Sequence, residues 1–439
     1  MRLRLLSLAS LVGLAAMSLR PRAAHANGRF PFANQLVVDP GDDTHLVLRT
    51  TYGLLQSDDA GKHWNWLCEK SIGYTGILDP AIGVTKDGTI LAGIFDGLSV
   101  THDRGCNWPH APGDLDKQYV IDVAIEPRTP TNAVAITASG LDDAGTRVII
   151  AQTSDDGKTW TPAGVSIPAD FTAETIDVAP SDPKRLYVSG YFGTPHVAAI
   201  ERSDDRGATW TRLPIALAGI DIPYIGAIDP DDENLVYVRL DGDLNDSLVV
   251  TRDGGTTWTK VATFEADVLG FAISPDGSRI AAGGTKDGLK IASKSDLSFK
   301  QTSRIQVRCL TWSARGLYAC AAEFPDLFTV GLTTDEGATF AQLYHLSDLA
   351  QKVCPSSSNT GTLCPADWPG VQDLLGAVDV GVDDTGIPAD SAVADAGPSP
   401  DAPTDSGCGC GIPGRVSGPL AFFAATFALG LLAMRRRRR

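Results

Sequence analysis

Rings and carboxylates lie close together in several segments that the chain pattern places in loops. The segment Tyr191-Phe192-Gly-Thr-Pro-His196 carries rings, the segment Asp241-Gly-Asp243 carries carboxylates, and Tyr224 precedes the second segment. Flat rings stack on apolar faces of sugars, and carboxylates accept hydrogen bonds from hydroxyl or amide groups. We therefore expect a ligand-binding surface for a glycan or a protein loop, formed by Tyr191, Phe192, His196, Tyr224, Asp241 and Asp243. The other interpretation is that these rings only cap a central channel.

Signatures of metal or nucleotide enzymes are missing from the sequence. His102 and His110 lack the spacing of helical zinc ligands and have no suitable cysteine pair nearby. The glycine-rich string from Ala282 lacks the lysine of a phosphate loop, and the motif G-x-S-x-G does not occur. The sequence therefore predicts no cofactor and no metal site, and it assigns no catalytic residue.

A short motif, S/T-x-D-x-G-x-x-W/F, recurs along the chain at intervals of 41 to 52 residues. Six copies are well kept, and a decayed seventh ends at Phe299 where a repeat is due. The aspartates of the six copies are Asp59, Asp103, Asp155, Asp205, Asp253 and Asp335. Aspartate accepts hydrogen bonds from turn amides, glycine adopts positive φ, and the aromatic residue packs against the next unit.

Alternating apolar strands rich in β-branched residues precede each motif, separated by Pro, Asp and Gly turns. Four strands in each repeat of 40 to 50 residues are typical of a β-propeller blade. We therefore predict an all-β fold, a seven-bladed propeller of four-stranded blades, with the motif as the turn between the third and fourth strands. The ends show no obvious strand swap, so ring closure is expected to depend on packing between blades.

The repeated turn resembles the Asp-box, or BNR repeat, of a fold group that contains sialidases, sortilin-like receptors and photosystem assembly factors. The resemblance covers some 280 residues, and it implies the fold more than a function. Sialidases use an arginine cluster, a tyrosine nucleophile activated by glutamate, and an acid/base aspartate. Arg29-Phe30-Pro31 resembles their Arg-Ile-Pro motif, but the middle residue departs from it, and no other member of the set is assigned. The alternative is that Arg29 only fixes the first strand.

Eight cysteines indicate disulfides if the chain is exported. Cys309 and Cys320 flank a short turn symmetrically, so they are expected to face each other across a hairpin. Cys354 and Cys364 are expected to close a loop, and Cys68 with Cys106 is the pair left by elimination. Cys408 and Cys410 belong to the C-terminal tail.

Both ends look like targeting segments. Residues 1–26 have the charged, apolar and small-residue regions of a signal peptide. Residues 412–434 are apolar enough for one transmembrane helix and precede five arginines. Without the ten arginines of these two ends, 27 basic residues face 53 acidic ones, a net charge of −26. Such a charge argues against nucleic acid as a partner.

The segments between these ends divide into three parts. Residues 27–350 are the predicted propeller, residues 351–368 a disulfide-closed extension, and residues 369–407 an acidic disordered linker. Calcium binding in the linker is the weaker alternative to a solvated spacer. Residues 408–439 resemble the MYXO-CTERM sorting tail of exported myxobacterial proteins. That resemblance implies processing by a sorting protease at Cys408 and Cys410, display at the outer membrane or cell surface, and a membrane partner; the alternative is a plain anchor.

The sequence thus favours an exported, surface-displayed propeller that binds a glycan or a protein without catalysis. The first alternative is an extracellular glycoside hydrolase of the sialidase type. The second is an assembly factor for a membrane complex, which the resemblance to photosystem factors implies. Fold alone does not decide between these functions.

Overall fold

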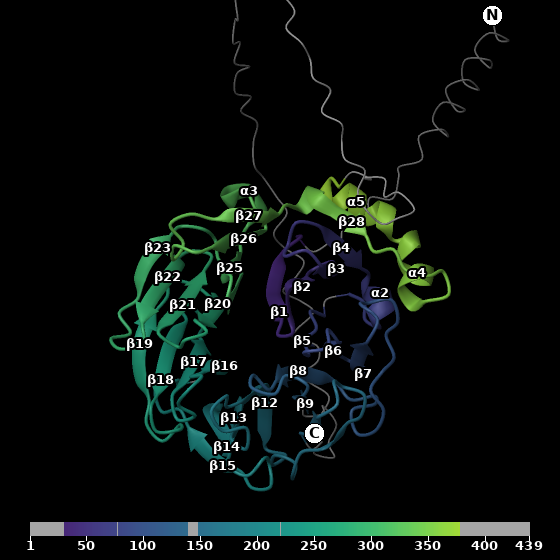
Figure 1. The fold of residues 1–439 in the computed structure, drawn as a ribbon. Coiled ribbons are helices and arrows are strands. Elements are labelled where there is room, and N and C mark those ends of the chain that lie inside the picture. Colours follow the sequence, from purple (N-terminus) through teal and green to yellow (C-terminus); the bar gives the residue numbers. More distant parts are fainter. Residues whose placement is uncertain (1–29, 77, 139–147, 220, 378–439) are drawn as a thin grey trace, which may run out of the picture. The chain divides into compact units, whose positions relative to one another are not determined.

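Seven β-sheets form a ring in the computed structural model, which describes residues 30–76, 78–138, 148–219 and 221–377 (Figure 1). The predicted seven-bladed propeller is therefore confirmed. Contacts divide the chain into two units, Met1–Ala389 and Asp390–Arg439, and all described residues belong to the first. The predicted signal peptide, most of the linker, and the tail with Cys408 and Cys410 lie outside the described residues.

Each blade runs from an inner strand near the centre of the ring to an outer strand at its rim (Figure 1). Blade one contains β1 (Ala33–Asp39), β2 (Asp42–Thr50), β3 (Gly53–Ser57) and β4 (Trp64–Leu67), and blade two β5 (Ile82–Val84), β6 (Ile90–Ile94) and β7 (Gly97–Thr101). Blade three contains β8 (Val120–Ile125), β9 (Ala133–Thr137), β10 (Ile150–Thr153) and β11 (Thr161–Pro162), and blade four β12 (Phe171–Val178), β13 (Leu186–Phe192), β14 (Val197–Ser203) and β15 (Thr211–Pro214).

The remaining three blades repeat the four-stranded order. Blade five contains β16 (Ile222–Ile228), β17 (Val236–Asp241), β18 (Ser247–Thr251) and β19 (Thr259–Thr263), and blade six β20 (Val268–Ile273), β21 (Arg279–Gly284), β22 (Gly288–Ser293) and β23 (Lys300–Ser303). Blade seven contains β24 (Cys309–Ser313), β25 (Gly316–Cys320), β26 (Val330–Thr333) and β27 (Ala341–Tyr344).

Blade two has three strands, and a single bridge between Ser99 and His110 stands in place of the fourth. The chain after Trp108 contains Pro109 and Pro112. Proline has no amide hydrogen to donate to a ladder, so a regular outer strand cannot form there.

Apolar side chains fill the spaces between neighbouring blades. One cluster joins Val47 and Leu54 of blade one to Ile90 and Ala92 of blade two, and all four are fully buried. Six further clusters repeat this arrangement among the described residues. The core is therefore a set of interfaces between blades, which keeps the loops at the channel mouth in fixed positions.

The ring is closed by the chain that follows blade seven. Strand β28 (Leu349–Gln351) pairs in parallel with β4, with Leu349 opposite Trp64. The sequence predicted closure by packing between blades and showed no strand swap, whereas blade one gains this fifth strand at its rim. Packing contributes as well, since the hydroxyls of Tyr52 and Tyr344 lie 3.0 Å apart and both rings are buried.

The extension after β28 is helical and covers blades one and two. It contains α4 (Asn359–Leu363), η2 (Cys364–Ala366) and α5 (Trp368–Leu375), while η1 (Leu346–Asp348) precedes β28. Trp368 and Leu375 are buried, so the linker that was expected from residue 369 begins with helix instead. Short helices α2 (Glu69–Ile72) and α3 (Glu323–Asp326) lie in blade connections. Among the described residues, no helix is long and apolar enough to span a membrane.

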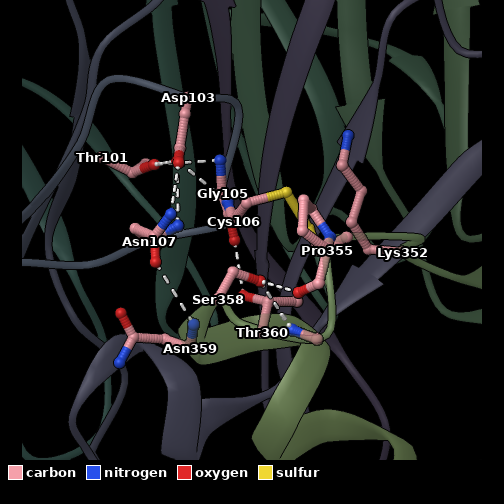
Figure 2. Close-up of a disulfide and its surroundings, with 12 residues drawn as sticks. Thr101, Asp103, Gly105, Cys106, Asn107, Lys352, Pro355, Ser358, Asn359 and Thr360 are labelled. Atoms are coloured by element: carbon pink, nitrogen blue, oxygen red, sulfur yellow. Dashed lines mark hydrogen bonds between the residues drawn. A yellow bond between two sulfur atoms is a disulfide. The ribbon is translucent and has the colours of Figure 1, made fainter.

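Two of the three predicted disulfide pairs are wrong. The bonds are Cys68–Cys364 and Cys106–Cys354, whereas Cys309–Cys320 is the predicted hairpin bond. Local spacing misled the prediction, because α4 folds back onto the turn of blade two. Figure 2 shows this contact, in which Thr360 donates to the carbonyl oxygens of Cys106 and Gly105.

Candidate functional site

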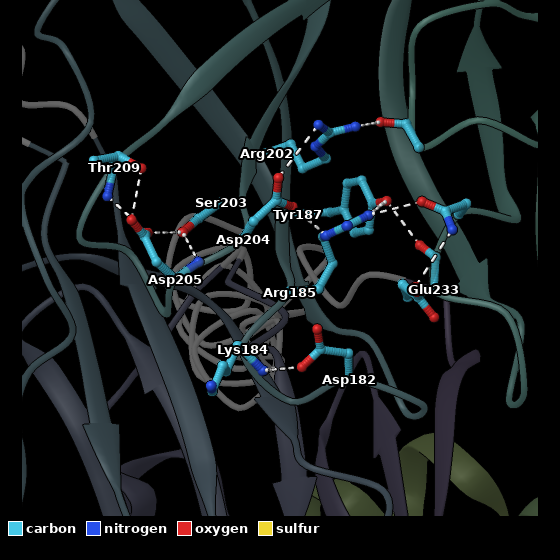
Figure 3. A network of polar contacts seen from close by, with 12 residues as sticks. Asp182, Lys184, Arg185, Tyr187, Arg202, Ser203, Asp204, Asp205, Thr209 and Glu233 are labelled. Carbon is cyan, nitrogen blue, oxygen red and sulfur yellow. Dashed lines mark hydrogen bonds and ion pairs between the residues drawn. The ribbon is translucent and has the colours of Figure 1, made fainter.

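The repeated turns lie between the third and fourth strands of their blades, on the face that also carries the first hairpins. At blade four, Asp205 accepts hydrogen bonds from the Ser203 hydroxyl at 2.8 Å and from the Thr209 amide and hydroxyl at 2.8 and 2.7 Å (Figure 3). Such bonds stabilise the carboxylate and lower its pKa, to about 2 at Asp253 and Asp335. The six aspartates therefore hold turns and are already engaged.

The turn also explains its glycine and its aromatic residue. Gly207 has φ +86°, and a Cβ there would lie 2.5 Å from the Ala163 carbonyl oxygen of blade three. The Trp210 ring donates to the Val165 carbonyl oxygen at 3.1 Å, so it too reaches the previous blade. The decayed copy has Leu297 at the glycine position with φ +51°. These turns bond blades together, and we call their side of the ring the turn face.

Ion pairs add further bonds between blades on the turn face. Arg185 of blade four contacts Asp204 and donates to Tyr187 and to Asn234 of blade five (Figure 3). Tyr187 donates in turn to the Glu233 carbonyl oxygen at 2.7 Å. Since these groups satisfy one another, we assign this network to structure.

The opposite side of the ring, the loop face, carries the connections between second and third strands and between successive blades. All six predicted ligand-binding residues lie there. Tyr191 and His196 stack at 4.3 Å in the hairpin of blade four. Phe192, beside them, lies under the Arg212 guanidinium at 4.5 Å. Tyr224, Asp241 and Asp243 lie in blade five.

Tyr224 lies at the centre of a group of charged residues on this face. It is close to Glu174 of β12, in the neighbouring blade, and each of the two residues affects the pKa of the other. The Arg239 guanidinium lies 4.4 Å from the centre of the Tyr224 ring and donates to the Val268 carbonyl oxygen. Arg239 also lies 3.8 Å from the Asp241 carboxylate. The structure thus joins two predicted residues to Glu174 and Arg239, which the sequence did not single out.

Burial, with a smaller contribution from the negative charge of Asp241, raises the pKa of Glu174 to about 7 against the opposing effects of Tyr224 and Arg239. Burial and the charge of Glu174 likewise raise the pKa of Tyr224 to about 12. A carboxyl group with a pKa near 7 carries a proton about half the time at neutral pH, which suits a general acid. Two carboxyl groups, Glu174 and Asp241, thus lie close together on the loop face.

Other groups surround this centre. Phe95 and Tyr119 form a ring pair at 4.6 Å, and burial followed by the charge of Glu174 raises the pKa of Tyr119. Burial also raises the pKa of Asp221; the positive charge of Lys260 opposes this shift, and the charges of Asp243 and Asp241 add to it. The aromatic pair and the acidic group therefore flank Glu174 from blades two, three and five.

Arg212 forms a second charged group on the loop face. Its guanidinium donates two hydrogen bonds to Asp170, at 2.8 and 2.9 Å, and one to Glu201 at 2.6 Å. Both Arg212 and Arg239 are thus held by carboxylates of this chain. Their charges are compensated before any ligand arrives.

Two further carboxyl groups lie along the same inner strands. Asp122 of β8 accepts hydrogen bonds from the amides of Val123 and Ile176, both at 2.9 Å. Burial raises its pKa to about 6, and burial with the charge of Asp122 raises the pKa of Asp177 well above its ordinary range. Among the described residues, no three His, Cys, Asp or Glu side chains gather as metal ligands do. Arg29 lies outside the described residues.

Comparison with known proteins finds similarity to two xyloglucanases over part of the chain. No family model matches the chain. The xyloglucanase Xgh74A of Acetivibrio thermocellus is 35% identical over 122 residues, which are 24% of this chain and 14% of that protein. The xyloglucanase of Hypocrea jecorina is 33% identical over 127 residues, 26% of this chain and 15% of that protein. The chain therefore matches about one seventh of the length of these relatives.

A solved structure with the same fold is that of AFV00434, an ancestral GH74 enzyme. It superposes with a TM-score of 0.53 at 14% identity, over 72% of this chain and 46% of that one. At this identity the likeness shows the fold alone, and the chain spans about half of that enzyme. The comparisons thus establish a propeller with sequence similarity to xyloglucanases over about a quarter of its length.

Proposed function

We propose that this protein is a glycoside hydrolase that cleaves a neutral polysaccharide at the loop-face mouth of its channel. The observation that carries the proposal is the Glu174 carboxyl group, whose pKa is raised to about 7 beside the Asp241 carboxylate and the Tyr224 hydroxyl. Hydrolysis of a glycosidic bond requires one carboxyl group that holds a proton and one that does not. The sequence similarity to two xyloglucanases supports the same class of reaction.

Each group at the mouth has a role in this reaction. The Glu174 carboxyl group gives its proton to the glycosidic oxygen as the bond to the anomeric carbon breaks. The Asp241 carboxylate accepts a proton from the water that attacks this carbon, which leaves a free reducing end and an alcohol. Tyr224 and Arg239 orient Glu174 and lower its pKa. Proton exchange with solvent then restores both carboxyl groups.

Charge at the mouth favours a neutral substrate over a sialoside. A sialidase needs arginines that are available to a substrate carboxylate. Arg212 is held by Asp170 and Glu201, and Arg239 lies beside Asp241 and Asp246. Asp221 and Asp243 lie close to Asp241 and add negative charge there, which Lys260 offsets in part. A carboxylated sugar would therefore be repelled, whereas hydroxyl groups can donate to these acceptors.

The second candidate is a module that binds a polysaccharide without cleaving it, which the sequence favoured. The specific observation for it is the stacked pair of Tyr191 and His196, which offers a ring surface on the loop face without a catalytic group in contact. Aromatic surfaces of this kind bind sugars in either case. Cleavage is what separates the two candidates.

The deciding experiment incubates the full chain with xyloglucan, an unbranched β-glucan and a sialoside, and measures bound protein and new reducing ends. We expect new reducing ends from a neutral polysaccharide, and a loss of at least 100-fold in kcat for Glu174→Gln. Asp87→Asn, an exposed carboxylate on the turn face, is the matched control and should retain activity. Retention without cleavage would support the second candidate, and cleavage of the sialoside alone would contradict the neutral substrate.

The proposed location is outside the cytoplasm. Three disulfides among the described residues indicate an oxidising compartment. Processing at Cys408 and Cys410 by a sorting protease and anchoring at the outer membrane remain part of the proposal, supported by the sequence of the tail. Mass spectrometry of the mature protein would identify its two ends.

A further inference from the structure

A second concave site lies on the loop face, where the first described residues, α3 and α5 meet. It is a groove of about 420 Å³, within the range of small-ligand sites. Its walls include Phe30, Phe324, Glu323, Ser347, Leu374 and Leu375. These elements belong to blades seven and one and to the extension, on the other side of the ring from β12 (Figure 1). None of these residues takes part in the proposed reaction.

Two exposed rings form the upper wall of the groove. Phe30 and Phe324 are 51% and 69% exposed, and their ring centres lie 6.0 Å apart in an edge-to-face arrangement. A phenylalanine that is exposed to this extent gains nothing from the core of the propeller. Phe30 is supported from behind by Phe32 at 4.6 Å, so its ring is held in place while one side remains open. Such rings are available to stack on a ligand.

Polar groups lie at the base of the same groove. One oxygen of Glu323 accepts a hydrogen bond from the Thr329 hydroxyl at 2.6 Å, and the other lies 3.1 Å from Nδ1 of His345. A carboxylate has about four acceptor positions, so Glu323 retains acceptors for further hydroxyl groups. The described residues that line the groove include this one carboxylate and no arginine or lysine. The groove therefore suits a neutral ligand with hydroxyl groups and repels an anionic one.

The far wall is fixed in position. Leu375 is buried and Leu374 is half-exposed on α5, whose Trp368 packs against Trp66 at 5.7 Å. The disulfide Cys68–Cys364 and the ion pair between Lys70 and Asp367 hold the start of the same helix against blade one. A ligand would thus enter a groove that already exists.

We propose that this groove is an accessory subsite that binds one or two neutral sugar units of the polysaccharide whose backbone is cleaved near Glu174. This inference rests on the proposed function for its ligand class. Sugar rings have apolar C–H faces that stack on Phe30 and Phe324, and their hydroxyls donate to Glu323. Because the groove and Glu174 lie on one face but in opposite blades, a long chain reaches both sites, whereas a short oligosaccharide occupies only one.

The test compares long and short ligands in the full chain. Phe324→Ala and Phe30→Ala are measured against Val165→Ala, which removes an exposed apolar side chain outside the groove. Binding to xyloglucan is measured by affinity electrophoresis, and kcat/KM is measured on a xyloglucan oligosaccharide. We expect each phenylalanine variant to weaken polysaccharide binding by about 3- to 10-fold, with kcat/KM on the oligosaccharide within twofold of the parent. Phe324→Trp, which keeps an aromatic ring at this position, should bind the polysaccharide as the parent does. Thermal unfolding checks that each variant is folded.

The outcomes separate this inference from the proposed function. Cleavage by the parent with unchanged polysaccharide binding in both phenylalanine variants would overturn the subsite and leave the hydrolase intact. Polysaccharide binding without cleavage, still weakened in the variants, would overturn the hydrolase and retain the subsite. Equal losses on long and short ligands would show that the rings serve structure alone, against the subsite. Absence of any polysaccharide binding by the parent would overturn both.

Discussion

At the scale of single residues, Glu174 was not predictable because nothing next to it in the sequence marks it. Its partners, Tyr224 and Arg239, lie 50 and 65 residues later, and they meet only because β12 and β16 are adjacent inner strands. Tyr224 and Asp241 were predicted from their residue types. Glu174 becomes their neighbour only when the blades assemble into the propeller. The structure therefore adds the pairing across blades that local patterns cannot contain.

Replacing Arg239 with methionine should shift the pH profile of hydrolysis. Its positive charge lowers the pKa of Glu174, so its removal should raise that pKa. The basic limb of kcat/KM, which reports loss of the acid's proton, should move to higher pH by about 0.5 to 1 unit. Arg128→Gln, an exposed arginine on the turn face, should leave the profile unchanged. An unmoved limb in the Arg239 variant would rule out Glu174 as the acid.

Glu174 should also make stability depend on pH. Its pKa is raised from 4.5 to about 7 by burial, so the folded state holds its proton more tightly than the unfolded state. Its contribution is fully present below pH 4.5 and is lost as pH rises to about 7. Glu174→Gln should remove this dependence. Between pH 4.5 and pH 8, the parent should therefore lose about 1 to 3 kcal/mol more of its free energy of unfolding than the variant does. Denaturant titrations of both proteins at these two pH values would check it, and parallel curves would contradict it.

At the scale of elements, the repeated turn was the most informative feature of the sequence. Its aspartate, glycine and aromatic residue each meet a local requirement, and the structure places them at the predicted turn of the blade. Blade two departs from the pattern because prolines follow its motif. The extension was mispredicted because its composition is mostly polar. Its apolar residues Trp368 and Leu375 become buried only when the segment packs against blade one.

Removing one turn aspartate should reduce stability without affecting the site. Asp103 accepts hydrogen bonds from the Thr101 hydroxyl and from the amide and side chain of Asn107, at 2.7 to 2.9 Å (Figure 2). Asp103→Ala should lower the free energy of unfolding by about 1 to 2 kcal/mol, because turn amides lose their acceptor. Polysaccharide binding should be unchanged, since the turn lies on the other face. A binding defect greater than the unfolded fraction would contradict the separation of the two faces.

At the scale of the whole molecule, the disulfides tie the ends of the ring in a way that spacing along the chain did not predict. Cys68–Cys364 and Cys106–Cys354 join residues 296 and 248 positions apart, whereas Cys309–Cys320 spans 11. Both long-range bonds attach the extension to blades one and two, and β28 precedes both cysteines of the extension in the chain. Ring closure thus combines a strand, packed tyrosines and two covalent bonds.

Removing the two long-range disulfides should therefore destabilise the ring far more than removing the hairpin bond. In the loop-closure model, the Cys68–Cys364 bond contributes about 6 kcal/mol and the hairpin bond about 3 kcal/mol. One variant replaces all four cysteines of the long-range bonds with alanine, and another replaces Cys309 and Cys320 with alanine. The first should have a Tm well below that of the second. Limited proteolysis should then cut after β28 and release α5 first, and polysaccharide binding at the Phe324 groove should fall with it. Equal Tm losses, with α5 still protected, would show that β28 and the Tyr52–Tyr344 contact close the ring unaided.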